Sequence, residues 1–369
     1  MSRTYMRIGC DLTRGKSGGI SNLTGTITEI PTLGGTALQI YISIKRGWKM
    51  GSRIRDDDLQ TAIDILQATG IYVIVHGKLL YNFARAGTWM NQNRLLGTEL
   101  QESARFGASL VIHQGKYLEM DQMLSRQNYV ENLTEIVDQN PTLTNYLVLE
   151  NSSHQGTEMG YTLTDLVLID QMFPERVRLR IKYCLDLCHV FVSGELDMRD
   201  PVQVRSWLTR FNQELGLKRL EVVHFNDSSE PFGSQHDHHA DLMSGFIGNP
   251  LLGGSTHGYQ ELIRILSEYD IPLIMETSGE YTPLTDQIKL VRSWSVGDQE
   301  YEKIYHNQYL DRIQSASRKL STKAKSTTVP NLPSVQTLTQ TPKLPIKINI
   351  REHTPPLNLP MKIKIKLRQ

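Results

Sequence analysis

Side chains able to bind metal ions close six successive apolar runs of the sequence. We interpret these short runs as buried strands, each with a histidine or a carboxylate at its end or just inside it. Histidines and carboxylates gathered in a poorly hydrated site repel one another or stay unpaired unless a cation lies between them. The pattern therefore predicts a metal centre. Its first six candidate ligands are His76, His113, Glu150, Asp186, His224 and Glu276.

Three further candidates follow these strand ends, namely His189, Asp237 and His239. By spacing alone, His236 or His238 could exchange roles with His239. Such a mixture of nitrogen and oxygen ligands favours zinc, although manganese or iron would also accept it. Nine side chains are too many for one tetrahedral ion. They suffice for two or three ions if carboxylates bridge them, an arrangement typical of phosphoester hydrolysis.

The candidate ligands must be positioned by the strands that precede them. Short apolar runs alternate with amphipathic stretches, and those at 57–68, 118–139 and 201–215 are expected to be helices. Strand–helix alternation favours a parallel sheet, and eight repeats in about 300 residues favour a (β/α)₈ TIM barrel, in which all strand ends meet on one face. The expected strands are 6–11, 38–43, 72–76, 109–113, 146–150, 182–186, 220–225 and 271–276.

A doubly wound open sheet is the alternative architecture. It would be favoured by a dinucleotide-binding turn after the first strand. The turn at 13–19 contains glycine but lacks the G-x-G-x-x-G pattern, so no nucleotide cofactor is expected.

Composition indicates a globular protein of a reducing compartment. The chain has 369 residues, 39% of them hydrophobic, and only three cysteines, which is too few for a disulfide scaffold. Cys184 and Cys188, beside Asp186, are interpreted as buried filler, with soft metal ligands as the alternative. No apolar run predicts a signal peptide or a membrane span. We expect an intracellular monomer without a membrane partner, in the nucleus or the cytoplasm.

Charge divides the chain at about residue 310. Twelve basic and two acidic residues give 311–369 a net charge of +10, which leaves −9 for residues 1–310. The second part is rich in Ser, Thr, Lys and Pro, so we predict a catalytic domain at 1–310 and a disordered or irregular basic extension at 311–369. Residues 361–367 alternate Lys with Ile or Leu, a pattern compatible with an added strand. The extension could be a solvated tail, a nucleic-acid-binding arm or a nuclear-localisation-like signal.

Several motifs resemble those of the endonuclease IV family of apurinic/apyrimidinic (AP) endonucleases. Residues 183–189, Y-C-L-D-L-C-H, are similar to its C-x-D-x-C-H signature. Residues 224–228, H-F-N-D-S, together with 237–239, D-H-H, resemble its H-x-N-D-S/A segment and the ligands that follow it. Residues 150–160 resemble the family's E-N-T-x-x-Q-G-x-x-x-G motif, and residues 272–277 resemble its final strand. The resemblance covers about residues 7–294.

The resemblance implies a TIM barrel that holds three zinc ions. It assigns the first ion to His76 and His113, with Glu150 bridging to a second ion. The second ion would be held by Asp186, His224 and Glu276, and the third by His189, Asp237 and His239. The implied reaction is hydrolysis of the phosphodiester 5′ to an abasic site in double-stranded DNA, which leaves a 3′-hydroxyl and a 5′-deoxyribose phosphate. Glu150 and Glu276 are the implied catalytic residues. Trimming of blocked 3′ ends is a further implied activity.

The resemblance also suggests side chains that contact DNA. They are Arg46 and Trp48 after the second strand, Leu79 after the third, and Asn226 after the seventh. Leu79 stands where the family usually has tyrosine, so it could wedge into a base step but could not stack.

Other departures from the family pattern concern residues near the expected site. Asp11 replaces a histidine and Gly47 a common glutamine, and Ser244 replaces the glutamate of a G-E-G-x-I-G segment. None of them removes a candidate metal ligand.

Two other functions remain open from the sequence. A metal-dependent sugar isomerase would also gather carboxylates and histidines at barrel strand ends, but it would need a lysine near the metals. Lys45 and Lys78 are the lysines at strand exits. An inactive DNA-binding homologue is the second alternative, and the presence of all nine ligand types argues against it.

Overall fold

The computed structural model describes residues 6–12, 22–49, 54–85 and 90–326. The chain divides into two units, Met1–Lys319 and Leu320–Gln369. The predicted turn at 13–19 and the part of the basic extension at 327–369 lie outside the described residues. Among the described helices, none is both long and apolar enough to cross a membrane.

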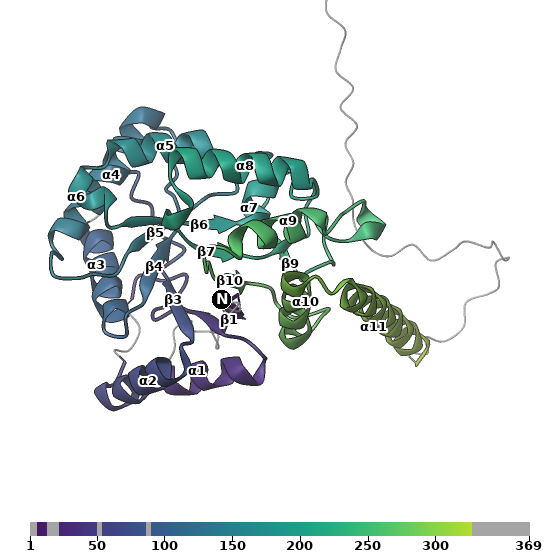
Figure 1. Ribbon diagram of the computed structural model, residues 1–369. Helices are drawn as coiled ribbons and strands as arrows, with labels where there is room; N and C mark the ends of the chain where they lie inside the picture. The colour runs from purple at the N-terminus through teal and green to yellow at the C-terminus, as the bar shows by residue number, and fades with distance from the viewer. Residues whose placement is uncertain (1–5, 13–21, 50–53, 86–89, 327–369) are drawn as a thin grey trace, which may run out of the picture. The chain divides into compact units, whose positions relative to one another are not determined.

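Eight parallel strands form a closed barrel (Figure 1), which confirms the predicted TIM-barrel fold. The hydrogen-bonded order is β1-β10-β7-β6-β5-β4-β3-β2, so neighbours in sequence are also neighbours in the barrel. Two short antiparallel strands, β8 and β9, pair outside it. The strands are β1 (Ile8–Asp11), β2 (Ala37–Ile40), β3 (Tyr72–His76), β4 (Ser109–Ile112), β5 (Leu147–Glu150), β6 (Ile181–Asp186), β7 (Leu220–His224), β8 (Asp227–Ser228), β9 (His239–Ala240) and β10 (Leu273–Met275).

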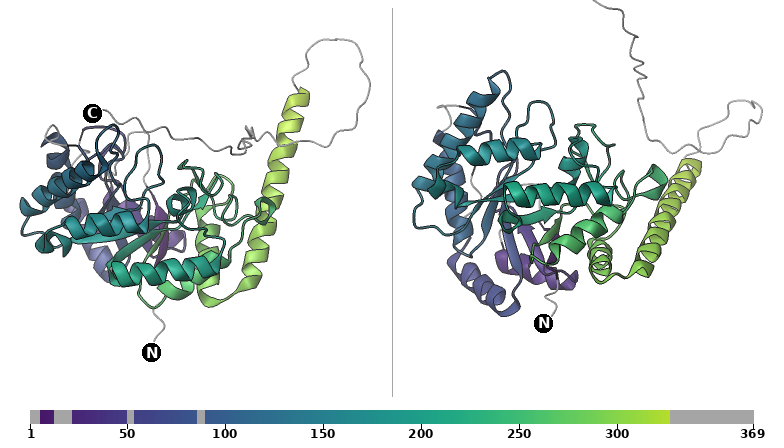
Figure 2. Two further views of the ribbon diagram at one scale, coloured as in Figure 1. Left: turned by 90° about the horizontal axis from the view of Figure 1, so that it is seen from above. Right: turned by 45° about the horizontal axis from the view of Figure 1, so that its top comes forward.

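Helices surround the barrel on its outer side (Figures 1 and 2). Two short 3₁₀ helices, η1 (Leu217–Arg219) and η2 (Pro250–Leu252), lie in loops. The α-helices are α1 (Leu23–Thr32), α2 (Asp56–Thr69), α3 (Met90–Ala104), α4 (Gln122–Asp138), α5 (Leu163–Met172), α6 (Glu175–Arg178), α7 (Leu187–Val192), α8 (Pro201–Glu214), α9 (His257–Leu266), α10 (Leu284–Val296) and α11 (Gln299–Ser326).

Local signals explain where the expected helices begin and end. The Asp200 carboxylate accepts from the first backbone N–H groups of α8, and Pro201 occupies a first-turn position where no N–H is needed. Gly70 ends α2 in the left-handed region at φ 67°. The helix expected from residue 118 begins only at Gln122, because the Asp121 side chain caps it by accepting from Leu124 N.

The inward-facing side chains fill the barrel below its carboxyl end. Seven buried residues form this layer, namely Ala37, Ile74, Val111, Val148, Cys184, Val222 and Ile274. The three cysteines are buried and free, and the Sγ atoms of Cys184 and Cys188 lie within 4.8 Å of candidate ligand atoms. Gly9 admits no side chain, because a Cβ there would lie 1.6 Å from Ala37 O on the adjacent strand. The filled interior gives the ligand-bearing ends a rigid floor.

The boundary expected at residue 310 falls inside helix α11, which continues to Ser326. Its first half packs on the barrel domain, since Tyr305 and Tyr309 are buried and the Tyr305 hydroxyl donates to Leu242 O at 3.0 Å. Arg312 lies within 2.8 Å of Asp286 on α10. The prediction that 311–369 is irregular throughout is therefore wrong for 311–326, because tertiary contacts at the start of the helix stabilise a segment of weak apolar pattern.

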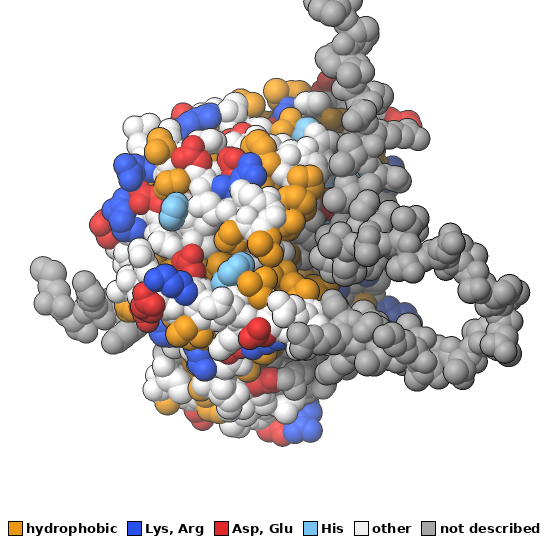
Figure 3. Space-filling model, turned by 90° about the vertical axis from the view of Figure 1, so that its right-hand side faces the viewer, with side chains coloured by type: hydrophobic (Ala, Val, Ile, Leu, Met, Phe, Trp, Pro, Cys, Tyr) orange, Lys and Arg blue, Asp and Glu red, His pale blue; other side chains and the backbone are white. Residues whose placement is uncertain are grey.

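Charges of both signs are intermixed on the face of the molecule that Figure 3 shows, with hydrophobic side chains gathered between them. The described residues that are visible on this face therefore form no uniformly basic patch.

Candidate metal centre

The structure brings all nine candidate ligands to the carboxyl end of the barrel. Six of them end a barrel strand or follow it directly, and the other three lie a little further along the chain, on a helix, in a loop and on a short strand. They are His76 on β3, His113 after β4, Glu150 on β5, Asp186 on β6, His189 on α7, His224 on β7, Asp237 before β9, His239 on β9 and Glu276 after β10.

Their ligand atoms converge in three sets, the first two of which share Glu150, and within each set these atoms lie no more than 4.8 Å apart. Two further groups bring Cys184 and Cys188 close to some of the same ligand atoms. The three sets match the three assignments that the family resemblance implies. They are His76, His113 and Glu150; Glu150, Asp186, His224 and Glu276; and His189, Asp237 and His239.

Glu150 joins the first two sets through its two carboxylate oxygens. Oε2 lies 3.2 Å from Nε2 of both His76 and His113. Oε1 lies 2.8 Å from Nδ1 of His224, which is also 3.2 Å from Glu276 Oε2. The side chain is 1% exposed, so its charge needs partners of opposite sign on both oxygens.

In the third set, Asp237 lies close to two histidines, as Glu150 does in the first set. Its Oδ1 lies 3.2 Å from Nε2 of His189 and 3.2 Å from Nε2 of His239. His239 Nε2 is also 3.5 Å from Asp186 Oδ2, which connects the third set to the second.

Three of the imidazoles are oriented by carbonyl acceptors on the side away from the carboxylates. His76 Nδ1 lies 2.8 Å from Gly77 O, and His189 Nδ1 lies 2.8 Å from Asn151 O. His224 Nε2 lies 2.8 Å from Gln39 Oε1. A carbonyl oxygen only accepts, so each of these nitrogens carries the proton. The other nitrogen of each neutral ring then turns its lone pair toward the carboxylates.

This arrangement fits divalent cations. Buried Nε2 atoms of His189 and His239 have no hydrogen-bond partner among the described residues. Lone pairs that face carboxylate oxygens repel them unless a cation lies between the two. Imidazole nitrogens held by an outer carbonyl, together with carboxylate oxygens, are a donor set that zinc accepts.

The charges of the cluster shift its pKa values in opposite directions. Burial alone would lower the pKa of His239, but the Asp186 and Asp237 carboxylates outweigh burial and raise that pKa to about 9. Burial would raise the pKa of Glu150, but His224 and His113 hold it well below its ordinary value. In the metal-free protein a proton thus takes the position that a metal ion would occupy, and the two compete for the same lone pair.

Gln39 is a residue of this site that the sequence analysis missed. It is fully buried on β2, its Oε1 accepts from His224, and its Nε2 donates to Glu276 Oε1. The available signal was a glutamine inside an apolar strand run, where a polar side chain needs partners. Tyr41, also missed, stacks on His76 with ring centroids 4.7 Å apart.

Asn226, expected to contact DNA, lies inside the protein behind the candidate ligands. The side chain is fully buried. Nδ2 donates to Asp186 Oδ2 at 2.7 Å, and Oδ1 accepts from the backbone N–H of Glu276 at 2.8 Å. The amide therefore orients two candidate ligands, and its buried position leaves no exposed surface for the expected DNA contact.

The other three candidate DNA contacts lie on two adjoining loops at the carboxyl end of the barrel. Arg46 is exposed, Trp48 is 47% exposed and Leu79 is half-buried. Leu79 N donates to Lys45 O at 2.9 Å, which joins the loop after β3 to the loop after β2.

Residues 243–248, where the chain departs from the G-E-G-x-I-G pattern, surround the carboxylate of Asp227, which is not a candidate ligand. Asp227 accepts hydrogen bonds from the backbone N–H groups of Gly245, Ile247 and Gly248. Ser244, at the position of the missing glutamate, donates to Asp241 O at 2.6 Å.

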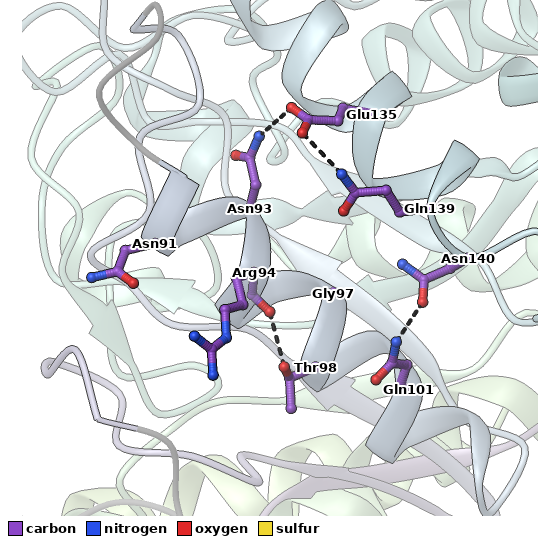
Figure 4. A pocket seen from close by; sticks show the side chains of 9 residues that line it. All are labelled: Asn91, Asn93, Arg94, Gly97, Thr98, Gln101, Glu135, Gln139 and Asn140. Atoms are coloured by element: carbon purple, nitrogen blue, oxygen red, sulfur yellow. Dashed lines mark hydrogen bonds between the residues drawn. The ribbon is translucent and has the colours of Figure 1, made fainter.

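A groove of about 660 Å³ lies apart from the cluster, between α3 and α4 (Figure 4). Amide side chains dominate its lining. Asn93 on α3 is hydrogen-bonded to Glu135 on α4, and Gln101 on α3 to Asn140, which lies just after α4. None of the nine candidate ligands lines this groove.

Comparison with known proteins supports a nuclease assignment. A family model described as xylose isomerase-like TIM barrel matches residues 30–295. A probable endonuclease 4 of Thermotoga petrophila is 30% identical over 266 residues, which cover 70% of this chain and 88% of that protein. A putative endonuclease 4 of Acanthamoeba polyphaga mimivirus is 25% identical over 279 residues, 71% of this chain and 86% of that protein.

Solved structures show that several enzyme classes share the fold. Endonuclease IV from Thermus thermophilus has a TM-score of 0.65 and 24% identity, with 79% of this chain and 99% of that chain covered. A D-tagatose 3-epimerase-like protein has a TM-score of 0.57 and 15% identity, with 80% and 99% covered. The fold alone therefore does not separate a nuclease from a sugar epimerase.

Proposed function

Because this chain belongs to the endonuclease IV family of AP endonucleases, we propose that it cleaves double-stranded DNA 5′ to abasic sites. The products would be a 3′-hydroxyl and a 5′-deoxyribose phosphate, and the same site would trim blocked 3′ ends. The observation that supports the proposal is the convergence of nine histidines and carboxylates in three sets, two of which share Glu150.

The proposed cofactor is zinc, with three ions held by the three ligand sets. Bound divalent ions would lower the pKa of water toward neutrality and neutralise charge on the phosphate oxygens. The side chains supply the geometry. Glu150 belongs to two of the sets. Gln39 is hydrogen-bonded to both His224 and Glu276 and orients them. Asn226 does the same for Asp186 and the backbone of Glu276.

The proposed substrate is a duplex from which the abasic nucleotide is extruded. Extrusion is easiest at an abasic site, because no base on that side loses pairing or stacking. Arg46, Trp48 and Leu79 are the proposed DNA contacts, and a leucine can insert into a base step without stacking. The proposed active form is a monomer.

The chain's lysines argue against a sugar isomerase. Lys45 Nζ lies 3.0 Å from Asp11 Oδ2, and Lys78 Nζ donates to two backbone carbonyls. Both ammonium groups thus have partners other than the candidate metal ligands.

Incision of a duplex with one tetrahydrofuran abasic analogue tests the proposal. The zinc-loaded protein should nick the strand 5′ to the analogue, which leaves a 3′-hydroxyl on one fragment and a 5′-phosphate on the tetrahydrofuran residue of the other. A chelator should abolish the nick and added zinc should restore it. Glu276→Gln should lower the incision rate at least ~100-fold while the circular dichroism spectrum is retained.

An intact duplex and an aldose substrate serve as controls. A folded protein that binds fewer than two zinc ions per chain, or that leaves the abasic duplex uncut when zinc-loaded, would contradict the proposal. Turnover of the aldose would support the isomerase instead.

A further inference from the structure

A buried polar cluster lies beside His76 and joins three elements of the barrel. We call it the loop anchor, and it consists of Ser43 after β2, Lys78 and Tyr81 after β3, and Glu99 on α3. All four residues are at most 5% exposed. None of them belongs to the three ligand sets, and the reaction proposed above gives them no role.

Lys78 binds both ends of the turn after β2. Its ammonium donates to Ile44 O at 3.1 Å and to Lys49 O at 2.8 Å. The residues between these two carbonyls include Arg46 and Trp48, two of the proposed DNA contacts. One buried cation therefore fixes the start and the end of the turn that presents them.

Glu99 holds the exits of β2 and β3 together. Its two carboxylate oxygens accept hydrogen bonds from the Ser43 hydroxyl and from the Tyr81 hydroxyl, the latter at 2.8 Å. The Tyr81 ring in turn lies beside Trp48, with centroids 6.5 Å apart. The loop of Leu79 is thus connected to the loop of Arg46 through side chains as well as through the backbone.

A buried ammonium group imposes one conformation on this turn. Leaving it without acceptors inside the protein is strongly unfavourable. Any arrangement of the turn that withdraws the Ile44 and Lys49 carbonyls would therefore be disfavoured. An apolar side chain in the same place would tolerate many arrangements.

We propose that Lys78 is a positioning residue for lesion recognition, which orders the turn at 44–49 before DNA binds. This inference rests on the proposed function, because it takes Arg46 and Trp48 as DNA contacts. Ordering the turn in the free protein removes an entropic cost from binding. The loss of Lys78 should therefore weaken binding to abasic DNA and leave the chemical step largely unchanged.

Lys78→Met is the test variant, because methionine keeps most of the apolar stem and removes the ammonium. With the zinc-loaded full-length protein, its dissociation constant for the tetrahydrofuran duplex should rise about tenfold, as expected for the loss of about 1.4 kcal/mol. Single-turnover incision at saturating enzyme should change less than about threefold. The zinc content should equal that of the parent.

Lys182→Met is the matched control. Lys182 is a half-buried lysine on β6 that pairs with Glu221, away from the turn. The Lys182→Met variant should keep the parent's dissociation constant. Tyr81→Phe, which removes only the hydroxyl bound to Glu99, is the milder second variant and should weaken binding in the same direction.

Hydrogen exchange separates this inference from the proposed function. Amides in 44–49 should exchange faster in Lys78→Met, or in Tyr81→Phe if the first variant does not fold, than in Lys182→Met. This readout needs no DNA. Unchanged exchange in 44–49 would overturn the inference whether or not the parent incises the duplex.

Binding provides the second decisive readout. A Trp48→Ala background should largely abolish the effect of Lys78→Met, because the anchor acts through the turn that carries Trp48. The inference would be overturned if the two substitutions reduced affinity additively. It would also be overturned if Lys78→Met weakened binding to intact and abasic duplexes equally. Absence of incision by the parent would instead overturn the proposed function.

Discussion

Gln39 determines which nitrogen of His224 faces the cluster. Its amide oxygen accepts from His224 Nε2 and its amide nitrogen donates to Glu276, so one side chain orients two candidate ligands. Outer partners of this kind fix the tautomer of a metal-binding histidine and increase its basicity. The geometry of the centre thus depends on residues that bind no ion themselves.

Replacing Gln39 with methionine should weaken zinc binding. The substitution removes both hydrogen bonds, which leaves His224 free to rotate and exposes Glu276 to repulsion from Glu150. We expect zinc affinity to fall about 10- to 100-fold. Zinc retained after dialysis against graded chelator concentrations measures this directly.

Gln260→Met on α9 is the control for that prediction. Gln260 is bonded to Thr256 and Glu302, so its loss should leave zinc retention at the parent level. Equal retention by the Gln39 and Gln260 variants would show that Gln39 does not support the centre.

The elements position the site because six of the eight barrel strands end at a candidate ligand or directly before one. His76, Glu150, Asp186 and His224 are the last residues of their strands. The surrounding helices must keep those strands in register. The pair α8 and α9 does so partly through a cross-helix ion pair, in which Arg205 Nε donates to Glu261 at 2.7 Å.

Glu261→Gln should make the protein less stable at neutral pH and should have no effect in strong acid. Arg264 and Arg205 lower the pKa of Glu261 to about 2. The pKa in the folded state is therefore below that in the unfolded state. The stabilisation is fully present above the unfolded value near 4.5 and is lost as pH falls toward 2.

Urea unfolding at several pH values checks this prediction. Solvent screening of the exposed guanidinium groups limits the difference between parent and variant to about 1 kcal/mol at pH 7. Glu300→Gln, which disrupts an exposed pair with Lys303, should cause no measurable loss. A Glu261 effect that persists undiminished at pH 2 would assign it to packing and not to charge.

The chain as a whole separates its charge along the sequence. The net charge of −9 on residues 1–310 is unfavourable for binding a polyanion such as DNA. Residues 327–369, in contrast, carry seven basic residues and one acidic residue. Lys and Arg attract phosphate regardless of base sequence. Since α11 packs on the barrel domain near Tyr305 and Arg312, a truncation that spares this helix must begin after Ser326.

Truncation after Ser326 should weaken DNA binding and flatten its dependence on salt. The deletion removes cations that would release counterions from DNA, so the slope of log affinity against log salt should become less negative. Fluorescence anisotropy between 50 and 200 mM salt, roughly the range in which such effects are large, measures the slope. Zinc content is the control and should not change.

An unchanged slope would assign the extension to another role. Localisation or assembly would then be the functions to test for residues 327–369.

The sequence by itself determined the ligand types, the number of barrel strands and the family. These features are encoded locally, since apolar runs predict buried strands and the residue that ends each run is visible in the sequence. A parallel barrel then requires that all such ends meet on one face.

Only the tertiary structure decided which polar residues hold the ligands in place. Gln39 acts on partners 185 and 237 residues away in sequence, and Lys78 binds carbonyls 34 and 29 residues away. The helix through 311–326 and the buried role of Asn226 likewise depend on neighbours that come together only on folding. A hydrogen bond between distant residues leaves no periodic pattern in the chain, so its partners become visible only when the barrel closes.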